Sequence, residues 1–81
     1  MEPKGIAMDR ERHRLFSVCH NEMLNVLDSN SGKVVAQVPI GKGVDGVIFD
    51  PMTRQIISSN GEVTLTVVQQ ISSNEYMSQK Q

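Results

Sequence analysis

Three observations predict an all-β protein made of two copies of a four-stranded antiparallel unit. Short runs rich in Val, Ile and Leu alternate with polar turn residues along the 81 residues. A repeat of about 41 residues with four strands is typical of β-propeller blades. We assign residues 1–41 to a first blade and 42–81 to a second. The stretch 5–28 repeats without a gap 41 residues later, with identical residues at five paired positions: Gly5 and Gly46, Asp9 and Asp50, Ser17 and Ser58, Leu24 and Leu65, Val26 and Val67.

The first unit contains four predicted strands, over residues 4–9, 14–19, 23–27 and 33–40. Acidic and basic side chains alternate over 9–14, which we expect to be a solvated turn. Residues 28–32 (DSNSG) are turn formers, whose side chains bond their own backbone or accept a positive φ. Pro39 predicts an edge strand, because proline cannot donate a hydrogen bond to a neighbour. The last strand of the second unit is weakly patterned over 74–81, so we expect it to end early.

Strands such as 33–36 (KVVA) and 47–49 (VIF) are apolar on both faces. In a propeller each sheet lies between two neighbouring sheets, so both of its faces are covered. Two blades alone leave two apolar outer faces bare. The predicted fold is therefore a fragment of a larger ring, and we expect the isolated chain to self-associate.

The segment 41–50 (GKGVDGVIFD) joins the two units and contains the pattern G-x-G-x-x-G. In a dinucleotide-binding fold this pattern opens a helix, whose N-terminus holds the pyrophosphate. Here Gly46 is followed by Val47-Ile48-Phe49 and then by Pro51, a β-branched and aromatic run that predicts a strand ending in a turn. We therefore interpret the glycines as a connection between strands.

Composition limits the class of function. The formal net charge is −1 and the pI is about 6.0, so no basic surface for nucleic acid is expected. No apolar run approaches the ~18 residues that a membrane-spanning helix needs. The first residues lack the apolar segment of a signal peptide. Cys19 is the only cysteine, so no intrachain disulfide can form.

Two short patterns resemble metal sites but lack necessary ligands. Residues 28–32 begin like a calcium loop, yet Lys33 stands where glycine is needed and Pro39 where a bidentate glutamate is needed. Cys19 and His20 could supply two ligands, yet His13 is the only other histidine and no second cysteine exists, whereas a structural zinc site needs four ligands. The sequence therefore predicts no metal site, no cofactor and no catalytic residue.

Several segments together resemble one family. They are GIAMD at 5–9, RLFSVC at 14–19, D-x-x-x-G-K-V-V at 28–35, PIG at 39–41 and SSNG at 58–61. This pattern is similar to the YVTN-type β-propeller repeat of YncE-like bacterial proteins, and it extends over nearly the whole chain. The turn with G-K-V-V followed by P-I-G is its most specific part.

The resemblance implies a ring of about seven blades, a periplasmic or secreted location, and a ligand-binding role without enzymatic activity. We therefore expect a non-catalytic scaffold that binds a protein or a small molecule. Two alternatives remain open. The chain could be a piece of a propeller enzyme, such as a quinoprotein-like dehydrogenase or a lactonase, or a truncated chain with no function alone.

Four strands that run up and down in order place three connections on one rim, near residues 19–22, 41–45 and 60–62. Loops on a rigid scaffold are where binding usually occurs. The alternative is that the asparagines only form turns. The candidate ligand-binding residues on this rim are His20, Asn21, Lys42, Asp45, Asn60 and Glu62.

Overall fold

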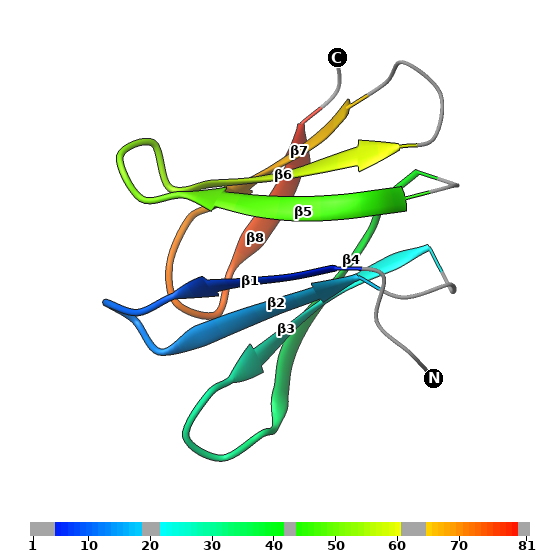
Figure 1. Cartoon of the computed structure of the whole chain (residues 1–81). Helices are drawn as coiled ribbons and strands as arrows, with labels where there is room; N and C mark the ends of the chain where they lie inside the picture. Colours follow the sequence, from blue (N-terminus) through cyan, green and yellow to red (C-terminus); the bar gives the residue numbers. More distant parts are fainter. Residues whose placement is uncertain (1–4, 19–21, 42–43, 61–64, 80–81) are drawn as a thin grey trace.

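Two four-stranded antiparallel sheets make up the computed structural model, which describes residues 5–18, 22–41, 44–60 and 65–79 (Figure 1). In both sheets the strands are neighbours in sequence order. The described residues form no helix, and so none that could cross a membrane. The predicted all-β fold of two antiparallel blades is confirmed. The strands are β1 (Gly5–Asp9), β2 (Arg14–Val18), β3 (Met23–Asp28) and β4 (Val34–Pro39), then β5 (Val44–Asp50), β6 (Gln55–Asn60), β7 (Leu65–Gln70) and β8 (Tyr76–Gln79).

Each strand of the first sheet corresponds to the strand of the second sheet that lies one repeat of 41 residues later. The β1–β2 turn corresponds in the same way to the β5–β6 turn. His13 and Arg54, which are 41 residues apart, both have a left-handed backbone, with φ of 56° and 59°. In each turn the preceding Asp side chain (Asp9 or Asp50) accepts the backbone N–H two residues later. The sequence repeat is therefore also a repeat of backbone geometry.

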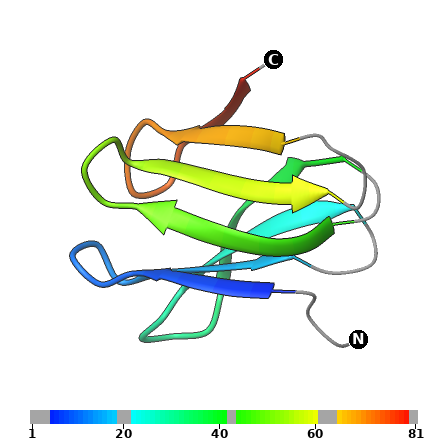
Figure 2. The same ribbon diagram turned by 45° about the horizontal axis from the view of Figure 1, so that its top comes forward.

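The strand connections fall into two groups, one at each end of the molecule (Figure 2). We call the end with the β1–β2, β3–β4, β5–β6 and β7–β8 turns the turn rim. The opposite rim is formed by the ends of β2, β4 and β6 and by the starts of β3, β5 and β7. This division agrees with the up-and-down order expected from the sequence.

The turns and edges agree with the sequence in detail. Gly32 has a φ of 75° in the β3–β4 turn, where Asp28 accepts the N–H of Gly32 on its backbone oxygen and that of Asn30 on its side chain. Pro39 lies on the edge strand β4. The strand β8 has 4 described residues, Tyr76–Gln79. A strand, β5, follows the glycine-rich segment in place of the helix that a dinucleotide site requires.

The core lies between the two sheets. Phe16 of β2 is fully buried, and its ring stacks on Phe49 at 5.2 Å and meets the edge of Tyr76 at 5.9 Å. Aromatic pairs with these centroid distances add to the free energy gained by burying their area. Both rings that pack against Phe16 come from the second sheet, so the core joins the two units. The buried apolar residues are Phe16, Val18, Leu24, Val26, Val38, Ile40, Ile56 and Val68.

The strands β1 and β5 lie side by side where the two sheets meet (Figures 1 and 2). A Cβ atom on Gly5 would lie 3.1 Å from both the Gly46 Cα and the Val47 backbone nitrogen. A Cβ atom this close would require the neighbouring backbone to give by a few tenths of an ångström, so glycine is favoured at position 5. The first paired position of the repeat is thus explained by close contact between strands.

Candidate functional site

The structure describes only the backbone of two of the six candidate rim residues. Asp45 lies in β5 at a shift of register between Val44 and Gly46, and Asn60 pairs with Val44 at the end of β6. The backbones of Asp45 and Asn60 therefore come together on the opposite rim. Their side chains lie outside the described part, as do the other four candidates: His20, Asn21, Lys42 and Glu62.

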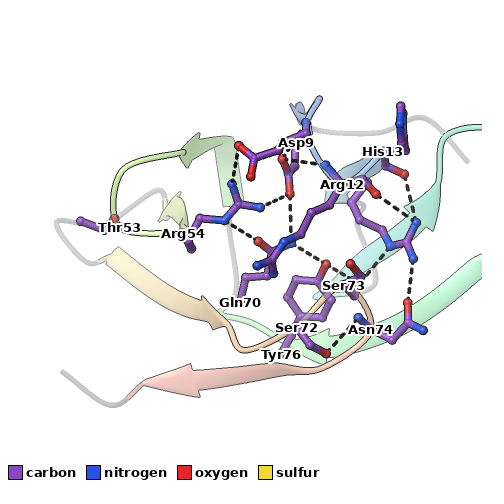
Figure 3. A network of polar contacts seen from close by, with 12 residues as sticks. Asp9, Arg12, His13, Thr53, Arg54, Gln70, Ser72, Ser73, Asn74 and Tyr76 are labelled. Carbon is purple, nitrogen blue, oxygen red and sulfur yellow. Dashed lines mark hydrogen bonds and ion pairs between the residues drawn. The ribbon is translucent and has the colours of Figure 1, made fainter.

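A buried polar cluster that sequence reasoning missed lies on the turn rim, between the two sheets (Figure 3). Its centre is Asp9, which is only 2% exposed. The Oδ1 atom accepts the backbone N–H groups of Glu11 (3.1 Å) and Arg12 (3.3 Å). The Oδ2 atom accepts hydrogen bonds from Arg54 Nη2 and from Gln70 Nε2. The expectation that the 9–14 segment is a solvated turn is thus wrong for Asp9, because the second sheet covers it.

Arg54 supplies the positive charge that a buried carboxylate requires. Its Nε donates to Gln70 Oε1 at 2.9 Å, and its guanidinium lies 5.0 Å from the centre of the Phe49 ring. Asp9 belongs to the first sheet, whereas the other three residues belong to the second. Arg54 has the same left-handed backbone as His13, so both units share this turn geometry. At this turn position only the second unit has an arginine, because the first has His13.

Gln70 and Tyr76 extend the cluster towards the β7–β8 turn. The Gln70 amide donates to both Asp9 Oδ2 (3.2 Å) and Tyr76 Oη (3.0 Å), and its oxygen accepts from Arg54. The Tyr76 hydroxyl in turn donates to the Ser73 carbonyl oxygen at 2.8 Å. Burial raises the pKa of the Tyr76 phenol above its ordinary value of 10.0, although the hydrogen bond from Gln70 and the charge of Arg14 act in the opposite direction.

The raised pKa of Tyr76 predicts a loss of stability at alkaline pH. In the folded chain the neutral phenol is favoured, so this stability is complete below pH 10.0, the ordinary pKa, and is lost as the pH rises through the folded pKa. The Tyr76→Phe variant has no phenol to ionise, so its stability will not show this alkaline loss. At neutral pH its free energy of unfolding will be lower than that of the unmodified chain by about 1 kcal/mol, because Gln70 loses a hydrogen-bond partner. Urea unfolding on both sides of pH 10.0 measures the difference. Tyrosinate absorbance reports the ionisation of Tyr76 alone, since the chain has 1 Tyr and no Trp. If the folded chain ionised with a midpoint at the ordinary pKa of 10.0, the prediction would be contradicted.

Arg14 makes a second link between the sheets on the same rim. Its Nε donates to the Ser73 carbonyl oxygen at 2.9 Å, and its Nη2 donates to Asn74 Oδ1 at 2.8 Å. Its Nη1 lies 3.8 Å from Asp28 Oδ2 within the first sheet. The arginine therefore ties β2 to both the end of β3 and the β7–β8 turn.

The cluster is arranged for structure and not for proton transfer. A general base needs a carboxylate that can reach a substrate proton, and here four protein donors occupy the Asp9 oxygens. An open hollow of about 370 Å³ lies beside Asp9 and Arg54, with Met8, Phe49 and Pro51 in its walls. Within the described ranges, no three His, Cys, Asp or Glu residues come together in a way that could hold a metal ion.

The comparisons with known proteins bear on the fold. No protein-family model and no curated protein matched the sequence. Among solved structures, the chain is similar to the β-propeller domain of Cps50 (Swd1) from Myceliophteria thermophila, with a TM-score of 0.75 and 18% sequence identity. The match covers 96% of this chain and 25% of that one, so the chain spans about a quarter of that domain's length. The chain therefore has the fold of β-propeller blades.

Proposed function

We propose that this chain is a non-catalytic β-propeller scaffold of the YVTN type, which binds a protein or small-molecule ligand at the opposite rim. In this proposal residues 1–41 and 42–81 are its two blades. The binding residues are His20, Asn21, Lys42, Asp45, Asn60 and Glu62. The family resemblance extends the proposal to a bacterial protein of the periplasm or the cell exterior.

The observation that carries the proposal is the pairing of Asp9 across the two sheets. Asp9 Oδ2 of the first sheet accepts hydrogen bonds from Arg54 and Gln70 of the second, and Gln70 also donates to Tyr76. Such pairing stabilises the contact between the sheets on the turn rim. Strands held in this way form a rigid framework, and loops on a rigid framework are where binding usually occurs.

A peptide selection tests the proposal. A random peptide library displayed on phage is selected against the 81-residue chain, and an enriched peptide is measured by calorimetry. We expect the triple variant Asn21→Ala, Lys42→Ala, Asn60→Ala to weaken binding roughly tenfold or more. The matched control, Arg10→Ala with Lys33→Ala, changes two exposed residues of the turn rim and is expected to bind as the unmodified chain does.

Two results would overturn the proposal. One is a library that yields no peptide sensitive to the triple variant. The other is saturable binding of calcium together with pyrroloquinoline quinone, which would indicate a piece of a quinoprotein-like enzyme. Both ligands are therefore titrated into the same sample of the chain.

A further inference from the structure

We propose that the outer face of the second sheet binds a second copy of this chain, on the outer face of that copy's first sheet. The two copies would then be arranged head to tail. The contact is separate from the rim that carries the proposed ligand site. The chain already contains one interface of this kind.

Inside the chain, one face of the first sheet is covered by one face of the second. The covered side chains are Ala7, Phe16, Val18 and Leu24, of which the last three are buried. The side chains that cover them come from alternating positions of β5 and β6, among them Val47, Phe49 and Ile56. Antiparallel strands alternate their side chains between two faces, so these sets define which face of each sheet points inward.

The residues of the second unit that are equivalent to the covered residues lie on the outer face of the second sheet. The residues 41 positions after Ala7, Phe16 and Leu24 are Ile48, Ile57 and Leu65. Ile48 is 61% exposed and Leu65 49%. With Gly46 and Ser59 these three residues line an open hollow of about 470 Å³. An apolar face that is buried in one copy of the unit is thus exposed in the other.

The repeat also identifies a face that matches it. The residues 41 positions before Val47, Phe49 and Ile56 are Ile6, Met8 and Leu15. They lie on the outer face of the first sheet, where Ile6 is 56% and Met8 44% exposed. A second copy can therefore cover Ile48, Ile57 and Leu65 with the same positions that cover the first sheet within the chain. Apolar patches of this kind mark interaction surfaces.

Gly46 supports the same arrangement. Glycine is favoured at position 5, because a Cβ atom there would crowd the Gly46 backbone. A Cβ atom on Gly46 would meet only Ser59 Oγ, at 3.8 Å, which is an ordinary contact. Nothing in the described part of the single chain therefore requires glycine at position 46. A second copy would favour glycine there, because its Gly5 and Ile6 would approach Gly46 as Gly46 and Val47 approach Gly5 within the chain.

A polar pairing agrees as well. Within the chain, Asp9 meets Arg54, which has a left-handed backbone. The same relation between copies places Asp50 of one chain opposite His13 of the next, again at a left-handed residue. Asp50 is 41 positions after Asp9, and His13 is 41 positions before Arg54. The contact between copies would thus pair the carboxylate with an imidazole in place of a guanidinium.

This interface joins two different surfaces, so a pair of copies still has one free face of each kind, one on each copy. Such contacts give a ring when the rotation closes and a filament when it does not. Analytical ultracentrifugation of the 81-residue chain over a wide range of concentration is expected to show reversible association. A chain that remains a monomer throughout would overturn the proposal.

Three variants test the geometry. Gly46→Ala is expected to keep the circular dichroism spectrum of the unmodified monomer and to weaken association roughly tenfold, since an added methyl group meets backbone across the interface. His13→Arg is expected to tighten association roughly tenfold, because it reproduces the Arg54 pairing. This gain should vanish when Asp50→Asn is also present.

The controls separate this arrangement from others. Unchanged association of folded Gly46→Ala would overturn the proposal, and so would a His13→Arg gain that persists with Asp50→Asn. A two-fold dimer through the second sheet alone would respond to Gly46→Ala but not to His13→Arg. That outcome also overturns it.

Discussion

Asp9→Ala will lower the free energy of unfolding by about 3 kcal/mol, because it leaves Arg54 without the carboxylate that neutralises it between the sheets. The side chain of Arg54 is 19% exposed, and this access to water places the loss at the lower end of the range for buried ion pairs. Gln70 Nε2 also loses an acceptor, as do two backbone N–H groups of the turn. Urea unfolding followed by circular dichroism measures the change.

Glu11→Ala is the matched control for Asp9→Ala. Glu11 is 80% exposed and its Oε2 lies 3.9 Å from the same Arg54 guanidinium. An exposed ion pair of this kind contributes little, so the control is expected to change stability by less than about 0.5 kcal/mol. Equal losses for the two variants would show that the cluster does not hold the sheets together. A fixed low protein concentration keeps association from adding to the measured stability.

Phe16→Ala will lower the free energy of unfolding by about 4 kcal/mol, because it leaves a cavity between the sheets. Phe16 is fully buried, stacks on Phe49 and meets the edge of Tyr76. Domains are stabilised by only about 0.05–0.15 kcal/mol per residue, so for a chain this short the variant approaches complete unfolding. Thermal melting in the presence and absence of a stabilising osmolyte measures the loss.

Met52→Ala is the control for Phe16→Ala. Met52 is 91% exposed in the β5–β6 turn, so its loss is expected to change stability by less than about 0.5 kcal/mol. A Phe16→Ala chain that melts within a few degrees of the unmodified chain would contradict the importance of this contact. The two variants together separate burial between the sheets from apolar character as such.

Much of the fold could be predicted because each strand and turn depends on nearby residues. The β-branched runs, the DSNSG turn and Pro39 were each sufficient to place an element to within about one residue. The repeat then supplied the second sheet without further evidence. The polar cluster could not be predicted in this way, because Asp9 and Gln70 are 61 positions apart and have polar side chains typical of turns.

One signal could have indicated the cluster. Asp9 and Asp50 match in the repeat, but His13 is replaced by Arg54 at the equivalent turn position. An arginine that appears in only one copy suggests a contact that only that copy makes. Gln70 and Tyr76, in contrast, correspond to Ser29 and Val35, and nothing in the sequence relates them to Asp9.

Local propensity and spacing are enough to predict the strands, their order, the repeat and the apolar character of both faces of each unit. Which faces meet depends on tertiary packing, because side-chain alternation alone does not say which of two apolar faces is covered. Stacking of the sheets turned Asp9 from a turn residue into a buried ion-pair partner. The same stacking explains why glycine is favoured at position 5, where the strands are close. It leaves the equivalent face at Gly46 uncovered.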